Sequence, residues 1–285
     1  MAVRDLIHEH LGVTLSAEAK RRLRHARRLA PDATRGDAGA IRLTRRCLNR
    51  TRSLIRLLPK DDAHRCDLDR VLREASHTLG EQRDLRAAAE RALELRGSAK
   101  SKKERRALRH VAKALRRRER TRAAESASPI VCRAIDRVLR ELPPMLEERS
   151  DGEIRRQIRA SYDSASRARR RAERARTDDT LHRWRRRARH LRNQLEAMPA
   201  HADRAFTRRL RRLTRGLGFV NDLAVLEALI SHPGVCDRET LPRVRHVLDR
   251  ERRSALKTSR RRGERLFTKR RPHLGLRADA RHRTS

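Results

Sequence analysis

Aromatic side chains are nearly absent from this 285-residue sequence, which contains one Trp, one Tyr and three Phe. Proteins that bind single-stranded nucleic acid usually stack the bases on aromatic rings, so the composition disfavours a site of that kind. Pro and Gly are also scarce, at 9 and 11 residues, and they leave few breaks in regular structure. Because Leu, Ala, Ile and Val recur at helical spacing, we predict an ordered, almost wholly helical chain despite its 40% charged residues.

Paired cysteines and long apolar runs are missing as well. The four cysteines form no CxxC pair, which favours free thiols in a reducing compartment over a disulfide framework or a zinc site; they are Cys47, Cys66, Cys132 and Cys236. No apolar run approaches the roughly 18 residues that a membrane span needs. The N-terminal MAVRDLIHEH carries charges where a signal peptide would be apolar. We therefore expect a cytoplasmic protein without a metal, a cofactor or a membrane contact.

Acidic residues are few beside basic ones. The sequence has 37 Asp and Glu against 76 Lys and Arg, a net charge of +39 and a pI near 11.8. Eight of the basic residues are Lys and 68 are Arg, whose planar guanidinium binds phosphate or carboxylate through two hydrogen bonds. Because a surface of this charge attracts polyanions, we expect an acidic partner. The oligomeric state is not indicated.

Helix-breaking segments divide the chain into pieces of helical length. Helices are predicted near 5–29, 37–58, 64–96, 101–124, 129–147, 151–176, 179–197, 203–231 and 239–264. Connections this short favour antiparallel neighbours, so helical bundles are the expected architecture. The basic segment 267–285 has no apolar period and is expected to be a disordered tail.

The second half of the chain repeats the first. AIRLTRRCLNRTRSLIRLL (40–58) aligns without gaps on TLHRWRRRARHLRNQLEAM (180–198), and LGEQRDL (79–85) aligns on LGFVNDL (217–223). We therefore predict an all-α fold of two antiparallel four-helix bundles related by an internal pseudo-twofold duplication. The predicted domains are an N-terminal bundle over 1–125, a connecting helix or hinge over 126–150, and a C-terminal bundle over 151–266.

The segment LHRWRRRARHLR (181–192) separates into two faces when its residues are placed at about 100° intervals around a helix. The apolar face contains Leu181, Trp184, Ala188, Leu191 and Leu195. A basic row lies directly beside it, spans roughly 15 Å, and contains His182, Arg185, Arg189 and Arg192. The remaining basic residues, Arg183, Arg187 and His190, are expected to face solvent.

The first basic helix has the same geometry with its own residues. Its apolar face contains Ile41, Thr44, Leu48 and Ile55, and its flanking row contains Arg42, Arg45, Asn49, Arg52 and Arg56. Arginines that served only solubility would favour the side opposite the core, whereas both rows border it. Such rows would line a cleft between helices and concentrate the field on an anion. The alternative is that their aliphatic stems merely cover apolar surface.

Two further pairs of residues occupy equivalent positions in the two halves of the sequence. Gly80 and Gly218 lie inside predicted helices, where each costs about 1 kcal/mol relative to Ala, and this indicates a close approach of helices. Asp84 and Asp222 follow one turn later and are predicted to orient an arginine of the basic helix, with ordinary core ion pairing as the alternative. His182 could contact an anion or serve a structural role. No nucleophile or base recurs beside it, so no catalytic residue is predicted.

LHRWRRRARHLR followed by LGFVNDL, with the degenerate copy upstream, resembles the CHAD family, the conserved histidine α-helical domain, over residues 5–264. QIRASYDSASRARRRAERA (157–175) is similar to the helix before the second histidine motif in many members. The resemblance implies two pseudo-twofold bundles, a basic central channel that binds inorganic polyphosphate, and localisation to polyphosphate granules. Some members carry a β-stranded triphosphate-hydrolysing domain; nothing here resembles it, so the chain resembles a stand-alone member.

The resemblance transfers to the site residues unevenly. His182, Arg185, Arg189 and Arg192 match the second motif, and Arg45 and Arg52 match the first. Arg42 stands where the family has a histidine, and Asn49 stands where a basic residue is usual. This departure counts against a mechanism that needs two imidazoles and favours binding by charge.

Three functions remain open, and we give them in order of preference. The first is non-enzymatic polyphosphate binding, because a groove of arginines without aromatics suits a polymer of phosphates without bases. The second is binding to a nucleic-acid phosphate backbone, which needs only cations. The third is a part in phosphoanhydride hydrolysis, for which metal-assisted chemistry would need clustered carboxylates; the acids here are scattered among arginines.

Overall fold

A computed structural model of the chain describes residues 10–121, 128–268 and 274, without the side chains of 81–84, 120, 121 and 128. This part of the chain forms ten α-helices and one short 3-10 helix, and no strand occurs in it. The all-α class predicted from the sequence is confirmed. Most of the predicted tail over 267–285 lies outside the described residues.

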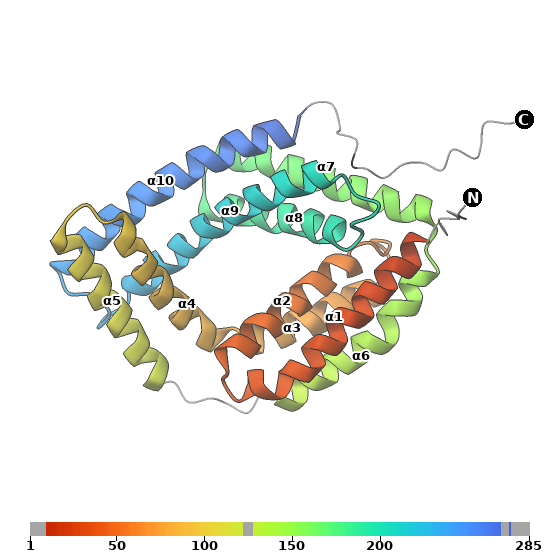
Figure 1. Ribbon diagram of the computed structural model, residues 1–285, viewed down its shortest axis with the longest axis horizontal. Helices are drawn as coiled ribbons and strands as arrows, with labels where there is room; N and C mark the ends of the chain where they lie inside the picture. The colour runs from red at the N-terminus through yellow and green to blue at the C-terminus, as the bar shows by residue number, and fades with distance from the viewer. Residues whose placement is uncertain (1–9, 122–127, 269–273, 275–285) are drawn as a thin grey trace, which may run out of the picture.

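The helices follow one another with short connections (Figure 1). They are α1 (Leu11–Thr34), α2 (Ala38–Ile55), α3 (Ala63–Thr78), α4 (Glu81–Glu94), η1 (Leu95–Ser98), α5 (Lys102–Thr121), α6 (Ser128–Glu147), α7 (Asp151–Ala175), α8 (Asp178–Glu196), α9 (Arg204–Ile230) and α10 (Thr240–Leu266).

Two predicted boundaries are wrong. The single helix predicted over 64–96 is interrupted at Leu79 and Gly80, which separate α3 from α4. The first helix, predicted to end at 29, continues to Thr34 with Pro31 inside it. Pro31 lies in the last turn, so its missing N–H and its ring disturb only the end of the helix. The predicted start of that helix near residue 5 lies outside the described residues.

Side-chain caps begin the helices that carry the repeated motifs. Asp37 accepts a hydrogen bond from the backbone N–H of Ala40 at the start of α2. The Thr177 hydroxyl does the same for Thr180 in α8, and Asp203 accepts from Ala205 and Phe206 in α9. Each cap satisfies an N–H group that the first turn leaves without an intrahelical partner. The capping residues therefore define where these helices begin.

Two hydrophobic clusters hold the helices together. In the first, α1, α2, α3 and α6 pack around one another and continue into α7, α8 and the first part of α9. In the second, α4 and α5 pack with the later part of α9 and the first part of α10. Both clusters thus draw helices from both predicted halves. The domain boundaries and the internal duplication stay predictions, and α6, expected as a connecting helix, packs along α1 and α3.

The apolar face predicted for 181–195 is buried, with Trp184 fully enclosed. Gly263 of α10 makes room for this indole, because a Cβ at that position would lie 2.6 Å from the Cζ2 atom of Trp184. Real Cβ contacts are never this close, so α10 reaches α8 only with glycine there. This packing fixes the rotation of α8 about its own axis. The rotation in turn sets the direction in which the basic row beside the buried face points.

Candidate functional site

A cavity of about 580 Å³ lies where α2, α3, α4, α8 and α9 meet. In Figure 1, α2 and α8 lie on opposite sides of the centre of the molecule. The basic residues lining the cavity are Arg45, Arg52, Arg73, His77, Arg91, His182, Arg185 and Arg189, and the acidic ones are Glu90, Glu94 and Asp222. The lining includes no Phe, Tyr or Trp. Cations are thus in excess on a concave surface, where low-dielectric walls strengthen their field.

Five of the eight residues predicted to bind the anion line this cavity: Arg45, Arg52, His182, Arg185 and Arg189. Arg42 is exposed and is not part of the lining. Arg56 faces Asp69 at 3.6 Å, and Arg192 donates to the Thr214 hydroxyl at 2.9 Å. These three lie at the ends of the two rows, beyond the region where α2 and α8 border the open space. Their part in binding stays a prediction.

The two repeated glycines face arginines rather than a neighbouring helix. A Cβ at Gly80 would lie 2.7 Å from Nη1 of Arg45 and 2.9 Å from the carbonyl oxygen of His77. A Cβ at Gly218 would lie 3.8 Å from Nε of Arg185, an ordinary contact. The expected close approach of helices is therefore wrong for both positions. Each of the two glycines instead lies beside an arginine that lines the cavity.

Gly80→Ala should weaken anion binding, whereas Gly218→Ala should not. The added methyl at residue 80 must displace the guanidinium of Arg45, for which we expect a loss of about fivefold in affinity, equivalent to roughly 1 kcal/mol. At residue 218 the methyl fits, and alanine inside α9 should raise stability by up to about 1 kcal/mol. Titration of both variants with long-chain polyphosphate and urea unfolding check this pair. Equal affinities of the two variants would contradict it.

Carboxylates hold some of the cavity arginines in place. Asp69 of α3 accepts from Nε of Arg52 at 2.9 Å and from Nη2 at 3.1 Å, a two-bonded pair. Burial alone would raise the pKa of Asp69, but the hydrogen bond and charge of Arg52, together with the charge of Arg56, lower it. The carboxylate therefore stays ionised and orients Arg52. Asp69 was not recognised from the sequence.

Arg189 of α8, in contrast to Arg52, forms no ion pair with a carboxylate among the described residues. Burial, followed by the charges of Arg185, Arg192 and Arg52, lowers its pKa to about 9. One of its Nη atoms lies 3.4 Å from the amide oxygen of Asn49, and its buried Nε has no acceptor among the described residues. A buried cation among cations destabilises the folded protein until an anion approaches it.

Asp222 has a different partner from the one expected. Its carboxylate accepts from Nη2 of Arg91 at 2.8 Å, so it pairs with α4 and not with the basic helix α8. Arg91 is further fixed by Glu94 and by the ring of Phe219, 5.0 Å from its guanidinium carbon. The prediction that Asp222 orients an arginine of the basic helix is therefore wrong; it forms an ion pair with Arg91, which also lines the cavity. The side chain of Asp84 lies outside the described residues.

His182 is oriented by a neighbour that the sequence motif contains. Its Nδ1 lies 2.8 Å from the amide oxygen of Asn221, which directly precedes Asp222 in LGFVNDL. Because an amide oxygen only accepts, Nδ1 carries the proton, and Nε2 is the second polar atom of a ring that lines the cavity. The side chain can thus serve a structural contact and face a ligand at once.

His190, expected to face solvent, is buried, with 5% of its surface exposed. Its Nδ1 lies 3.0 Å from the Ser53 hydroxyl, which also accepts from the Asn193 amide. Gln194 donates to the Ser53 carbonyl oxygen at 2.9 Å. These hydrogen bonds form a polar contact between α2 and α8. They fix the spacing between the two basic helices. The helical pattern did not reveal this contact because it depends on two distant segments.

Residues of α3 that were not predicted as site residues also line the cavity. Arg73 and His77 are one turn apart, and Ser76 lies between them on the same face. The spacing could have indicated a polar face on this helix. Nothing in this spacing indicated that the face lines one cavity together with residues of α2 and α8.

The fold and the cavity define an all-helical protein with a central, arginine-lined cavity. The chain belongs to the CHAD domain family, whose model matches residues 17–231. Its structure is similar to that of PptA from Streptomyces chartreusis, with a TM-score of 0.63, 18% identity, and coverage of 91% of this chain and 99% of the other. It is also similar to the CHAD domain from the plant Ricinus communis, with a TM-score of 0.60, 18% identity, and coverage of 93% and 94%. No curated protein matches the chain.

None of the helices is long and apolar enough to cross a membrane, as far as the described part of the chain goes. Within that same part, no group of three or more His, Cys, Asp and Glu side chains is placed to hold a metal ion. All four cysteines are free, and Cys47 is buried.

Proposed function

We propose that the protein binds inorganic polyphosphate in the cavity between α2, α3, α4, α8 and α9, and that it does so without catalysing a reaction. The observation that carries the proposal is the convergence of Arg45, Arg52, Arg185 and Arg189 from two helices on one cavity without an aromatic ring. Polyphosphate offers charge and acceptor oxygens but no base to stack. Membership of the CHAD family supports the same ligand, since the resemblance implies it.

The energetics of Arg189 favour a polyanion over a single small anion. Burial and four neighbouring arginines disfavour its charged form, and its Nε lacks an acceptor among the described residues. A chain of phosphates along the row would supply acceptors to several guanidinium groups together. Charge-assisted hydrogen bonds of this kind contribute about 1.5–3 kcal/mol each.

The test is a competition between long-chain polyphosphate, duplex DNA and single-stranded RNA for the purified protein at physiological salt. We expect polyphosphate to displace both nucleic acids, because the cavity lining has no stacking platform and its volume does not admit a duplex. Equal or better retention of either nucleic acid would overturn the proposal. Release of orthophosphate with a divalent metal would show an enzyme instead.

In the cell, we propose that this binding takes place in the cytoplasm and brings the protein to polyphosphate granules. Fluorescence microscopy of the tagged protein in cells with and without polyphosphate tests this. Foci that persist without polyphosphate would contradict it.

A further inference from the structure

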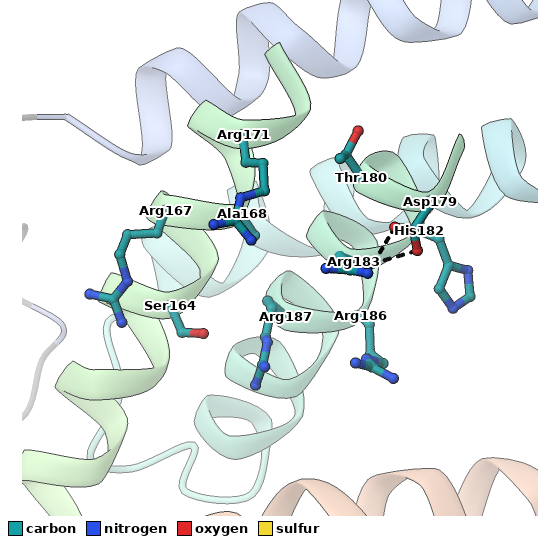
Figure 2. A pocket seen from close by; sticks show the side chains of 10 residues that line it. All are labelled: Ser164, Arg167, Ala168, Arg171, Asp179, Thr180, His182, Arg183, Arg186 and Arg187. Carbon is teal, nitrogen blue, oxygen red and sulfur yellow. Dashed lines mark hydrogen bonds and ion pairs between the residues drawn. The ribbon is translucent and has the colours of Figure 1, made fainter. Parts of the chain in front are cut away.

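A second basic pocket, of about 480 Å³, lies between α7 and α8. Figure 2 shows its arginines projecting from both helices. They are Arg167 and Arg171 from α7 and Arg183, Arg186 and Arg187 from α8. Asp179 is the one acid in this lining, and it forms an ion pair with Arg183 at 2.9 Å. The pocket therefore carries a strong excess of positive charge.

Most of the other arginines of this pocket have no carboxylate partner in the described part of the chain. Arg171, Arg186 and Arg187 make no ion pair with any residue in the described ranges. Burial, followed by the charges of Arg186, Arg167 and Arg65, lowers the pKa of Arg187. Concentrating cations in this way destabilises the protein unless an anion lies among them.

His182 connects this pocket with the central cavity. Its side chain belongs to the lining of both. Arg186 follows it by one turn of α8 and faces the second pocket, while Arg185 and Arg189 face the first. A linear anion that passes His182 would thus contact first the arginines on the cavity face of α8 and then those on the face toward α7.

We propose that the pocket between α7 and α8 is a second binding site for polyphosphate, occupied by the part of a long chain that leaves the central cavity past His182. The proposal rests on the function proposed above. It assigns the two pockets different ligand lengths: a short oligophosphate occupies the central cavity alone, and only a longer chain reaches Arg167 and Arg171.

The test compares Arg167→Gln/Arg171→Gln with the wild-type chain on two probes, tripolyphosphate and long-chain polyphosphate. Both side chains are exposed on α7 and lie outside the central cavity, so the double variant should fold normally. We expect its affinity for the long chain to fall about tenfold, with a shallower salt dependence because fewer phosphates are contacted. Its affinity for tripolyphosphate should stay within about twofold of wild type, since exposed charges at a distance are screened by salt.

Arg116→Gln/Arg117→Gln is the matched control. It removes the same two charges from exposed positions of α5, where they line a separate basic pocket with Arg109 and Lys113 and do not border the pocket between α7 and α8. We expect both affinities of the control to stay near wild type. An unchanged affinity of the α7 variant for the long chain, an equal loss for tripolyphosphate, or an equal loss in the control would each overturn the second site.

Failure of the proposed function would look different. In that case the wild-type chain would bind neither probe, or replacement of Arg185 and Arg189 would leave the binding of tripolyphosphate intact. An effect of the α7 variant on long chains alone, with tripolyphosphate still dependent on Arg185 and Arg189, supports both sites.

Discussion

Replacing Arg185 and Arg189 by Glu should reduce the affinity for polyphosphate by about 100-fold or more, equivalent to roughly 3 kcal/mol. Both side chains line the central cavity from α8. Each substitution removes a charge-assisted donor and adds a carboxylate that repels phosphate. The slope of log affinity against log salt should also fall by about two, because two phosphate contacts are lost. Fluorescence anisotropy with labelled long-chain polyphosphate over a salt series measures both quantities.

Two controls separate binding from folding. Arg116→Glu/Arg117→Glu changes the net charge equally on exposed positions of α5 and should bind nearly as wild type does. Arg189→Gln should leave the ligand-free protein as stable as wild type or more stable, since burial and neighbouring arginines disfavour the charged Arg189. Urea unfolding checks the second control. A loss of affinity in the α5 variant as large as that in the α8 variant would show that overall charge, and not the cavity, binds the polymer.

The protein should lose stability as the pH falls from about 6.5 toward 5, because of His190. Burial, followed by the charges of Arg56, Arg189 and Arg52, lowers the pKa of His190 well below 6.5. The unfolded chain binds a proton on this residue in that range and the folded chain does not, so stability rises with pH and decreases on acidification. The slope for one proton is about 1.4 kcal/mol per pH unit, which gives about 2 kcal/mol over the interval.

The hydrogen bonds of His190 explain why the proton is excluded. Ser53 donates its hydroxyl proton to the carbonyl oxygen of Asn49, so its oxygen accepts from Nδ1 of His190. Nε2 has no hydrogen-bond partner among the described residues and is buried. A proton there would be an unsatisfied cation between Arg56 and Arg189.

His190→Asn supplies the matched variant for this prediction. Its amide can donate to Ser53 as Nδ1 of the imidazole does, but it does not titrate. Urea unfolding at a series of pH values between 7 and 5 should therefore give a slope that is smaller by about one proton in the variant. An unchanged slope would mean that another group causes the loss of stability.

Much of the fold could be predicted from local patterns. The spacing of apolar residues placed Trp184 and its companions on the buried face of α8, as the structure confirms. The helix-breaking segments also marked most helix ends within a few residues. Gly80 and Pro31 were misjudged because their effect depends on position: Gly80 begins α4 beside Arg45, and Pro31 lies in the final turn of α1.

The site could be predicted only in part. Arg45, Arg52, His182, Arg185 and Arg189 followed from the rows beside two buried faces, and the structure brings them together. The residues that orient these side chains could not be predicted from the sequence. Asp69 and Asn221 are single polar residues in helices with many others, and only the packing of those helices shows which arginine or histidine each one contacts.

The sequence by itself determined the helical class, the faces of the two basic helices and the expectation of a polyanionic partner. These properties depend on composition and on spacing within a helix, which are local. The tertiary structure alone decided that α2 and α8 border one cavity with α3, α4 and α9, that Asp222 pairs with Arg91, and that His190 is buried. Each of these depends on contacts between segments far apart in the chain, and helical periodicity carries no information about which faces will meet.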